Sequence, residues 1–198
     1  GPCCSFDRGM ASERSWTHRM EHDNRFALAW ARDDFRWARL RAKLERIVAY
    51  FSGKPSELLR YNEVRRKLGS TNRIERGLQD IPLDAILGSV NRYADFTRHF
   101  FPKRDEDAAR WAHVWVAMAT QTGLPPIEVY QIGQVYFVVD GHHRVSVARE
   151  LGSSHIQAYV TEVETKVPLT PDVRPEDLTL KDAPSGGHKQ CGTHSVGV

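Results

Sequence analysis

The sequence is poor in cysteine, has no long apolar run and carries little net charge. Its 198 residues include three cysteines, and Cys3 and Cys4 are adjacent, which is no basis for a disulfide framework. A reducing compartment, the cytoplasm, is therefore expected. No apolar run approaches the roughly 20 residues of a membrane-spanning helix, and the N-terminus lacks a signal-peptide core, so no membrane partner is expected. The net charge of +3 does not by itself indicate nucleic-acid binding.

The sequence does contain enough apolar residues to form a core. A hydrophobic content of 40% in this length predicts one compact domain with extensions. Gly1-Pro2 is typical of a protease-cleavage remnant. Beyond Glu164 the chain turns to prolines, glycines and polar residues without apolar periodicity. The expected segments are a tag remnant and disordered tail at 1–21, a helical extension at 22–77, the domain at 78–164, and an extended or disordered tail at 165–198.

The helical extension shows a regular apolar stripe. From Asp23 to Phe51 large apolar side chains recur at alternating three- and four-residue steps, and Asp33 alone interrupts them. Such a face predicts a helix packed on the domain through Trp30, Trp37 and Leu44. A second, shorter helix is expected from Ser56 to Leu68. The members of the stripe are Phe26, Trp30, Trp37, Leu40, Leu44, Ile47 and Phe51.

Basic residues lie beside this stripe. One interpretation is a solvated helix face, whose positive charge the acidic residues Asp33, Asp34 and Glu45 partly offset. The other is a surface for the phosphate backbone of DNA. The solvated face is favoured, because no aromatic residues interleave as stacking platforms. The basic residues of the first helix are Arg25, Arg32, Arg36, Arg39, Lys43 and Arg46, and Arg65, Arg66, Lys67, Arg73 and Arg76 follow in the next segment.

The most informative block is Val138 to Val147, which reads Val-Val-Asp-Gly-His-His-Arg-Val-Ser-Val. Two β-branched residues end a strand, Asp140-Gly141 turns the chain, and His-His-Arg opens a helix. A helix start offers unpaired N–H groups and positive potential, and Gly141 and Arg144 add close approach and a planar donor fork. The block therefore predicts a phosphate cradle. The simpler alternative is an Asp-Gly turn beside a basic residue.

This block resembles the nucleotide-binding turn of the ParB/sulfiredoxin superfamily, which has Gly-Glu-Arg-Arg in partition proteins and Gly-Cys-His-Arg in sulfiredoxins. Versions similar to Asp-Gly-His-His-Arg occur elsewhere, including the free-serine kinases. The resemblance spans 78–164 and implies an α/β (α+β) fold, a small mixed sheet with helices. The corresponding flanking elements are strands at Ile81–Ile86, Pro125–Val129, Val135–Val139 and His155–Val160, with a long helix from Asp105 to Gln121.

The resemblance also implies a ligand and roles for residues. Members bind ATP or CTP, so a nucleoside triphosphate with Mg²⁺ is expected. Asp140 is the expected metal ligand, and Asp140 and His142 are the expected catalytic residues, although Asp140 is also an ordinary turn former. His142 stands where sulfiredoxins carry their reactive cysteine, so thiol-dependent repair is excluded. The expected nucleotide-binding residues are Gly141, His143 and Arg144, with Arg92 and Arg98 from the loop at 88–102.

Two classes of function follow. The first is an NTP-dependent phosphotransferase or NTPase, since phosphoryl transfer needs mainly positioning and charge neutralisation. The chain departs from the pattern of the kinases, because Asp84 and Asp95 stand where a catalytic glutamate is expected. The second is a ParB-like DNA-binding protein or nuclease that uses the basic helix, although only a short polar tail stands where partition proteins carry their helix-turn-helix. A nucleotide sensor without turnover is a third possibility. The nucleotide and the oligomeric state stay open.

Overall fold

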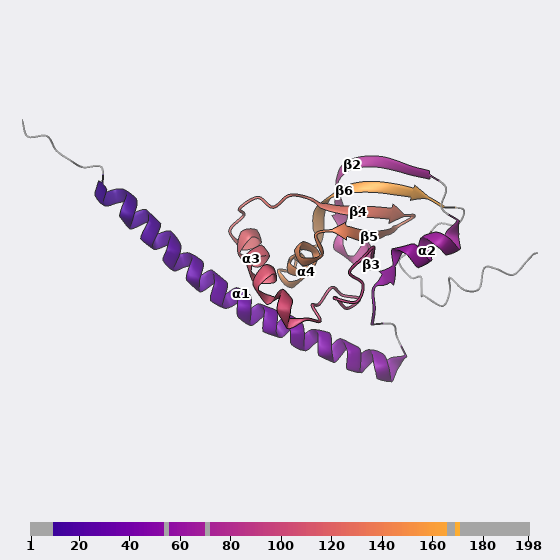
Figure 1. Ribbon diagram of the computed structural model, residues 1–198, viewed down its shortest axis with the longest axis horizontal. Coiled ribbons are helices and arrows are strands. Elements are labelled where there is room, and N and C mark those ends of the chain that lie inside the picture. Colours follow the sequence, from indigo (N-terminus) through magenta and orange to yellow (C-terminus); the bar gives the residue numbers. More distant parts are fainter. Residues whose placement is uncertain (1–9, 54–55, 70–71, 166–168, 171–198) are drawn as a thin grey trace, which may run out of the picture.

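The computed structural model describes residues 10–53, 56–69, 72–165 and 169–170 (Figure 1). In this part of the chain it is a mixed α/β fold, as the sequence predicts, and its sheet has six strands. The helices are α1 (Met10–Ser52), α2 (Tyr61–Leu68), α3 (Ala108–Ala119) and α4 (His142–Glu150). The strands are β1 (Leu59–Arg60), β2 (Asn72–Pro82), β3 (Ile86–Ser89), β4 (Ile127–Ile132), β5 (Val135–Asp140) and β6 (His155–Glu164).

The strand order is β1-β3-β5-β4-β6-β2. The pairs β1–β3, β3–β5 and β4–β6 are parallel, whereas β4–β5 and β2–β6 are antiparallel. Successive residues of a strand point to opposite faces, and Phe137 and Val138 accordingly belong to different cores. Tyr61 and Val64 of α2 pack with Phe137, while Val145 of α4 packs with Val138. The sheet is therefore covered by helices on both faces.

The long helix α1 lies outside α3, along the lower edge of the molecule in Figure 1. Phe35 of α1 meets Trp111 of α3 edge-to-face, with ring centroids 5.6 Å apart. Trp111 is fully buried and Trp115 nearly so, which confirms that both belong to the core. A polar contact also joins α1 to α4, because Arg41 donates to both carboxylate oxygens of Glu150 at 2.8 Å.

The predicted packing face of α1 is wrong. The residues of α1 that are buried are Ala31, Phe35, Ala38 and Ala42. Trp30, Trp37 and Leu44, the expected contacts, are 66%, 60% and 52% exposed. Alanines let the α1 backbone approach α3 closely, the large side chain of Phe35 is buried between the helices, and Leu28 packs beside them. The large apolar stripe consequently faces away from the domain.

Several expected boundaries also need correction. Residues 10–21 are helical, not a disordered tail, because no glycine or proline interrupts the sequence from Met10 to Ser52. The expected helix from Ser56 starts only at Tyr61, since β1 precedes it. Strand β2 begins at Asn72, inside the segment assigned to the helical extension, where it pairs with β6 along its whole length.

The strand expected at Ile81–Ile86 is divided. It comprises the end of β2, a 3-10 turn at Leu83–Ala85 and the first residue of β3. The expected long helix is a 3-10 turn at Asp105–Asp107 followed by α3. Of the C-terminal tail only 165 and 169–170 are described. Leu169 is buried, and its carbonyl accepts from Gln134 N–H at 2.9 Å, so this position is no solvated tail.

Within the described residues, no helix combines the length and the apolar character needed to cross a bilayer.

Candidate functional site

The predicted strand–turn–helix is present at Asp140–Gly141–His142. Gly141 has φ +100°, which L side chains rarely adopt, and a Cβ built there would lie 2.4 Å from Ile127 Cγ2. Only glycine fits this position without a shift of Ile127. No side chain caps the start of α4, so no side-chain oxygen competes for the N–H groups of its first turn. The positive end of the helix dipole lies at the same point.

His142 is buried at the start of α4. Its ring stacks on that of Phe96 at 5.9 Å, and its Nε2 lies 2.7 Å from Ser89 Oγ at the end of β3. Burial, followed by the charge of Arg92, lowers the pKa of His142 to about 4. The imidazole is therefore neutral at pH 7. Ser89 Oγ accepts the Arg92 backbone N–H at 3.0 Å, which leaves its own O–H to donate to His142.

His143 takes part in a second, charged network. Arg92 donates to Asp95 at 2.8 Å, to Asp107 at 3.1 Å and to His143 Nε2 at 3.1 Å. Burial also lowers the pKa of His143 to about 4, although Asp107 opposes that shift. A neutral ring that accepts at Nε2 carries its proton on Nδ1. Within the described part of the chain, His143 Nδ1 and Asp107 Oδ2 are buried without a hydrogen-bond partner.

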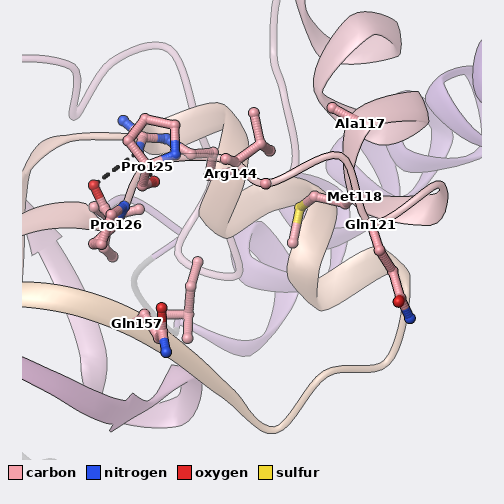
Figure 2. Close-up of a pocket in the computed structure, with 11 residues that line it drawn as sticks. Ala117, Met118, Gln121, Pro125, Pro126, Arg144 and Gln157 are labelled. Carbon is pink, nitrogen blue, oxygen red and sulfur yellow. Dashed lines mark hydrogen bonds between the residues drawn. The ribbon is translucent and has the colours of Figure 1, made fainter.

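Arg144 is directed at protein atoms (Figure 2). Its guanidinium donates to the carbonyls of Pro125 and Pro126 and, at 2.7 Å, to Asp140. It also lines a mainly apolar cavity of about 230 Å³ beside the end of α3, with Met118, Gln121 and Gln157 among the other lining residues. This is smaller than the roughly 300 Å³ at which small-molecule sites usually begin, so the cavity does not accommodate a whole nucleotide.

Asp140 lies at the turn and is exposed to solvent, whereas Arg98 lies away from the turn. The Asp140 side chain is 62% exposed and contacts Arg144. Arg98 does not join the network of Arg92 and His143. Its backbone N–H donates to the Ser56 carbonyl, and its charged neighbour is Glu45 of α1. The structure thus brings the predicted residues together around the start of α4, with the exception of Arg98.

Three residues of this region were not predicted as site residues: Ser89, Phe96 and Asp107. Asp107 lies at the start of the expected long helix, where the helix dipole alone favours a carboxylate. Ser89 reaches the site because it ends a strand that runs parallel to β5 and pairs with Val138. The carboxyl ends of parallel neighbours meet at one edge of a sheet. That pairing is not visible in the sequence.

The arrangement suits an anion better than a metal alone. The start of α4 and Arg92 supply donors, whereas no group of three or more His, Cys, Asp or Glu side chains in the described residues is placed to hold a metal ion. The exposed Asp140 is one carboxylate, and Mg²⁺ commonly takes only one or two from the protein, with phosphate oxygens and water completing its shell. The residues fit a metal ion that arrives with phosphates.

Comparison with known proteins finds similarity over the segment that contains this turn. Residues 96–170 match the model of the ParB N-terminal domain. Among solved structures, sulfiredoxin from Arabidopsis thaliana is similar, with 19% identity, a TM-score of 0.33, and coverage of 42% of this chain and 82% of that chain. No curated protein sequence matches this chain. Residues 96–170 are therefore similar to a ParB N-terminal domain, which confirms the resemblance to the ParB/sulfiredoxin superfamily.

Proposed function

We propose that the domain binds a nucleoside triphosphate, with its phosphates at the Gly141–Arg144 turn, and acts as an NTP-dependent phosphotransferase or NTPase. The observation that supports this most is the convergence at that turn. An uncapped helix start, a glycine that admits close approach, and Arg92 from another part of the chain lie together. The matched ParB segment contains the whole turn.

The positive potential offered to an anion at the turn comes from the uncapped start of α4. The positive charge of Arg92 is neutralised by Asp95 and Asp107. A phosphate that binds the Arg92 guanidinium therefore has to replace one of these carboxylates. Both imidazoles are neutral at pH 7, because burial lowers their pKa values. A phosphate beside His143 opposes that effect and raises its pKa. We therefore expect proton uptake when a nucleotide binds between pH 5 and 6.

Arg144 and Asp140 take separate parts in this proposal. Arg144 joins the start of α4 to the Pro125–Pro126 segment, and it reaches phosphate only by releasing some of these contacts. Asp140 would hold Mg²⁺ together with phosphate oxygens, and such an ion neutralises charge on the phosphates. His142, with Ser89 as its partner, positions the first turn of α4. A catalytic role of His142 would require access to a ring that is buried.

The test is calorimetry of the full chain with ATP, CTP and GTP, each with and without Mg²⁺. We expect Asp140→Asn to keep nucleotide binding within a few-fold and to abolish turnover. Arg144→Ala should weaken binding more than tenfold, in line with loss of a charge-assisted bidentate contact. Asp80→Asn is the matched control, since Asp80 is exposed on β2. No detectable affinity at millimolar nucleotide would refute the proposal.

Thermal unfolding must accompany the Arg144 variant, because this side chain also holds the backbone at Pro125 and Pro126. Arg144→Lys keeps the positive charge but not the planar fork. If both variants bind nucleotide like the wild type, Arg144 has a structural role only.

A second candidate, DNA binding, has one specific observation in its favour. Four cations of α1 line a single hollow of about 690 Å³ against α3. Arg36 and Arg39 are paired with Asp33 and Asp105, so the field is partly neutralised. The four cations are Arg32, Arg36, Arg39 and Lys43.

Replacing these four with Gln should reduce any steeply salt-dependent affinity for duplex DNA and leave nucleotide turnover unchanged. We expect the DNA effect to be weak. A nanomolar affinity at physiological salt that is lost in the variant would reverse the order of the two candidates, since non-specific binding usually lies near the micromolar range or above.

A further inference from the structure

The outward face of α1 carries an apolar stripe that no described part of the chain covers. Five of its members keep the heptad spacing of a coiled-coil seam: a step of seven residues, which spans the polar Asp33, is followed by steps of three, four and three. They are Trp30, Trp37, Leu40, Leu44 and Ile47, which are 66%, 60%, 44%, 52% and 53% exposed. We call these five residues the seam. Monomeric proteins rarely expose an apolar patch of this extent without a partner.

The seam and the contact with the domain lie on opposite sides of α1. Leu44 is nine positions after Phe35, which is two and a half turns of a helix, so the two side chains point in opposite directions. Phe35 is 5% exposed against α3, whereas Leu44 is 52% exposed. The seam can therefore be covered without any change in how α1 packs on its own domain.

We propose that the seam is the dimer interface of this protein, formed with α1 of a second copy in antiparallel orientation. The order of residues supports a second copy as the occupant, because the seam is self-complementary. A two-fold axis between Ala38 and Arg39 sets Trp37 opposite the second copy's Leu40 and Trp30 opposite its Ile47. A two-fold interface of this kind presents the same patch from both subunits.

Charge selects the antiparallel orientation. Asp33 occupies the one polar position within the stripe and is paired with Arg36 at 3.1 Å. In a parallel pair Asp33 would face the Asp33 of the second copy, which brings like charges together. In the antiparallel pair it faces Leu44 and keeps its ion pair with its own Arg36. The repulsion is thus absent from the antiparallel arrangement.

The available area is sufficient. Large apolar side chains that are about half exposed each contribute roughly 100 Å². The seam then supplies about 500 Å² per copy, and the adjoining Val48, Tyr50 and Phe51, which are 62%, 84% and 82% exposed, bring the total towards the roughly 800 Å² per partner of a standard interface. A dimer that forms at micromolar concentration is expected.

Sedimentation velocity of the full chain tests this proposal. Between about 1 and 100 µM the mean mass should rise from one chain to two, and 0.5 M salt should promote the rise, because cations such as Arg36 and Lys43 border the seam. Leu44→Glu should weaken association at least 100-fold. Leu78→Glu is the matched control, since Leu78 on β2 is also 52% exposed and lies away from α1. Both leucines are exposed, so circular dichroism should show unchanged folding.

Orientation is tested by cross-linking in a background with Cys3, Cys4 and Cys191 replaced by Ser. A mixture of Trp30→Cys and Ile47→Cys chains should form disulfide-linked dimers. Neither variant alone should do so, because identical positions near the helix ends lie roughly 25 Å apart along an antiparallel pair. A single-chain mass throughout the concentration range overturns the proposal. So does association that Leu44→Glu does not weaken, or cross-linking of Ile47→Cys by itself.

Discussion

Acid should destabilise this domain through the two adjacent histidines of α4. Both imidazoles are 4% exposed, and their pKa values lie at about 4, against 6.5 for an ordinary histidine. Burial is the main cause, and the charge of Arg92 adds to it. His142 and His143 also stand next to each other, so protonating both brings two positive charges together at the positive end of a helix.

The sign and size of the effect follow from the pKa values. The unfolded chain takes up these protons near pH 6.5, but the folded chain does so only near pH 4. The stability due to neutral histidines is therefore complete above pH 6.5 and is lost as the pH falls towards 4. A shift of this extent corresponds to roughly 3 kcal/mol for each imidazole. That is a large share of the 5–15 kcal/mol typical of a domain.

Urea unfolding at half-unit steps from pH 7.5 to 4 measures the effect. The double variant His142→Gln/His143→Gln should start less stable, yet it should lose less free energy of unfolding between pH 6.5 and 4. His113→Gln, at an exposed position of α3, is the control and should leave the slope unchanged. The carboxylates contribute equally to the pH dependence of all three proteins. A difference between the slopes of unfolding free energy against pH therefore reports the two histidines. Parallel loss of stability in the wild type and the double variant would refute the reasoning.

Two further predictions concern packing. Gly141→Ala should destabilise the domain by more than about 2 kcal/mol, because the new Cβ adds a clash with Ile127 to the cost of a positive φ. Gly152 also has a positive φ, but a Cβ there would meet open space. Gly152→Ala should therefore lower the free energy of unfolding in urea by less, and the difference between the two variants measures the clash. Phe35→Ala should cost about 3–5 kcal/mol and make α1 sensitive to limited proteolysis. Tyr50, in contrast, is 84% exposed in the single chain, so Tyr50→Ala should change the stability of the monomer by less than about 0.5 kcal/mol. Equal losses within either pair would contradict these explanations.

The candidate turn was predictable because its determinants are local. β-branched residues, a glycine and a helix-forming run are consecutive in the sequence, and the structure places β5, Gly141 and α4 where they predict. The partners of the turn were not predictable to the same degree. Ser89 lies 53 positions from His142, and Asp107 lies on another helix start, so both contacts depend on how β3 and the loop after it pack. Arg92 was correctly expected near the turn, while Arg98 faces α1.

The N-terminal helix shows the same division. Alternating apolar spacing and the absence of glycine and proline determined that residues 23–51 form a helix, because both act through the local backbone and side chains. The spacing did not determine which face would meet the domain. Helix packing depends on the shape of the opposing surface, and α3 accepts alanines and Phe35 more closely than it would accept tryptophans. The sequence by itself determined the helix, the turn and the resemblance to the ParB/sulfiredoxin superfamily; the tertiary structure decided their partners, because those contacts join residues far apart in the chain.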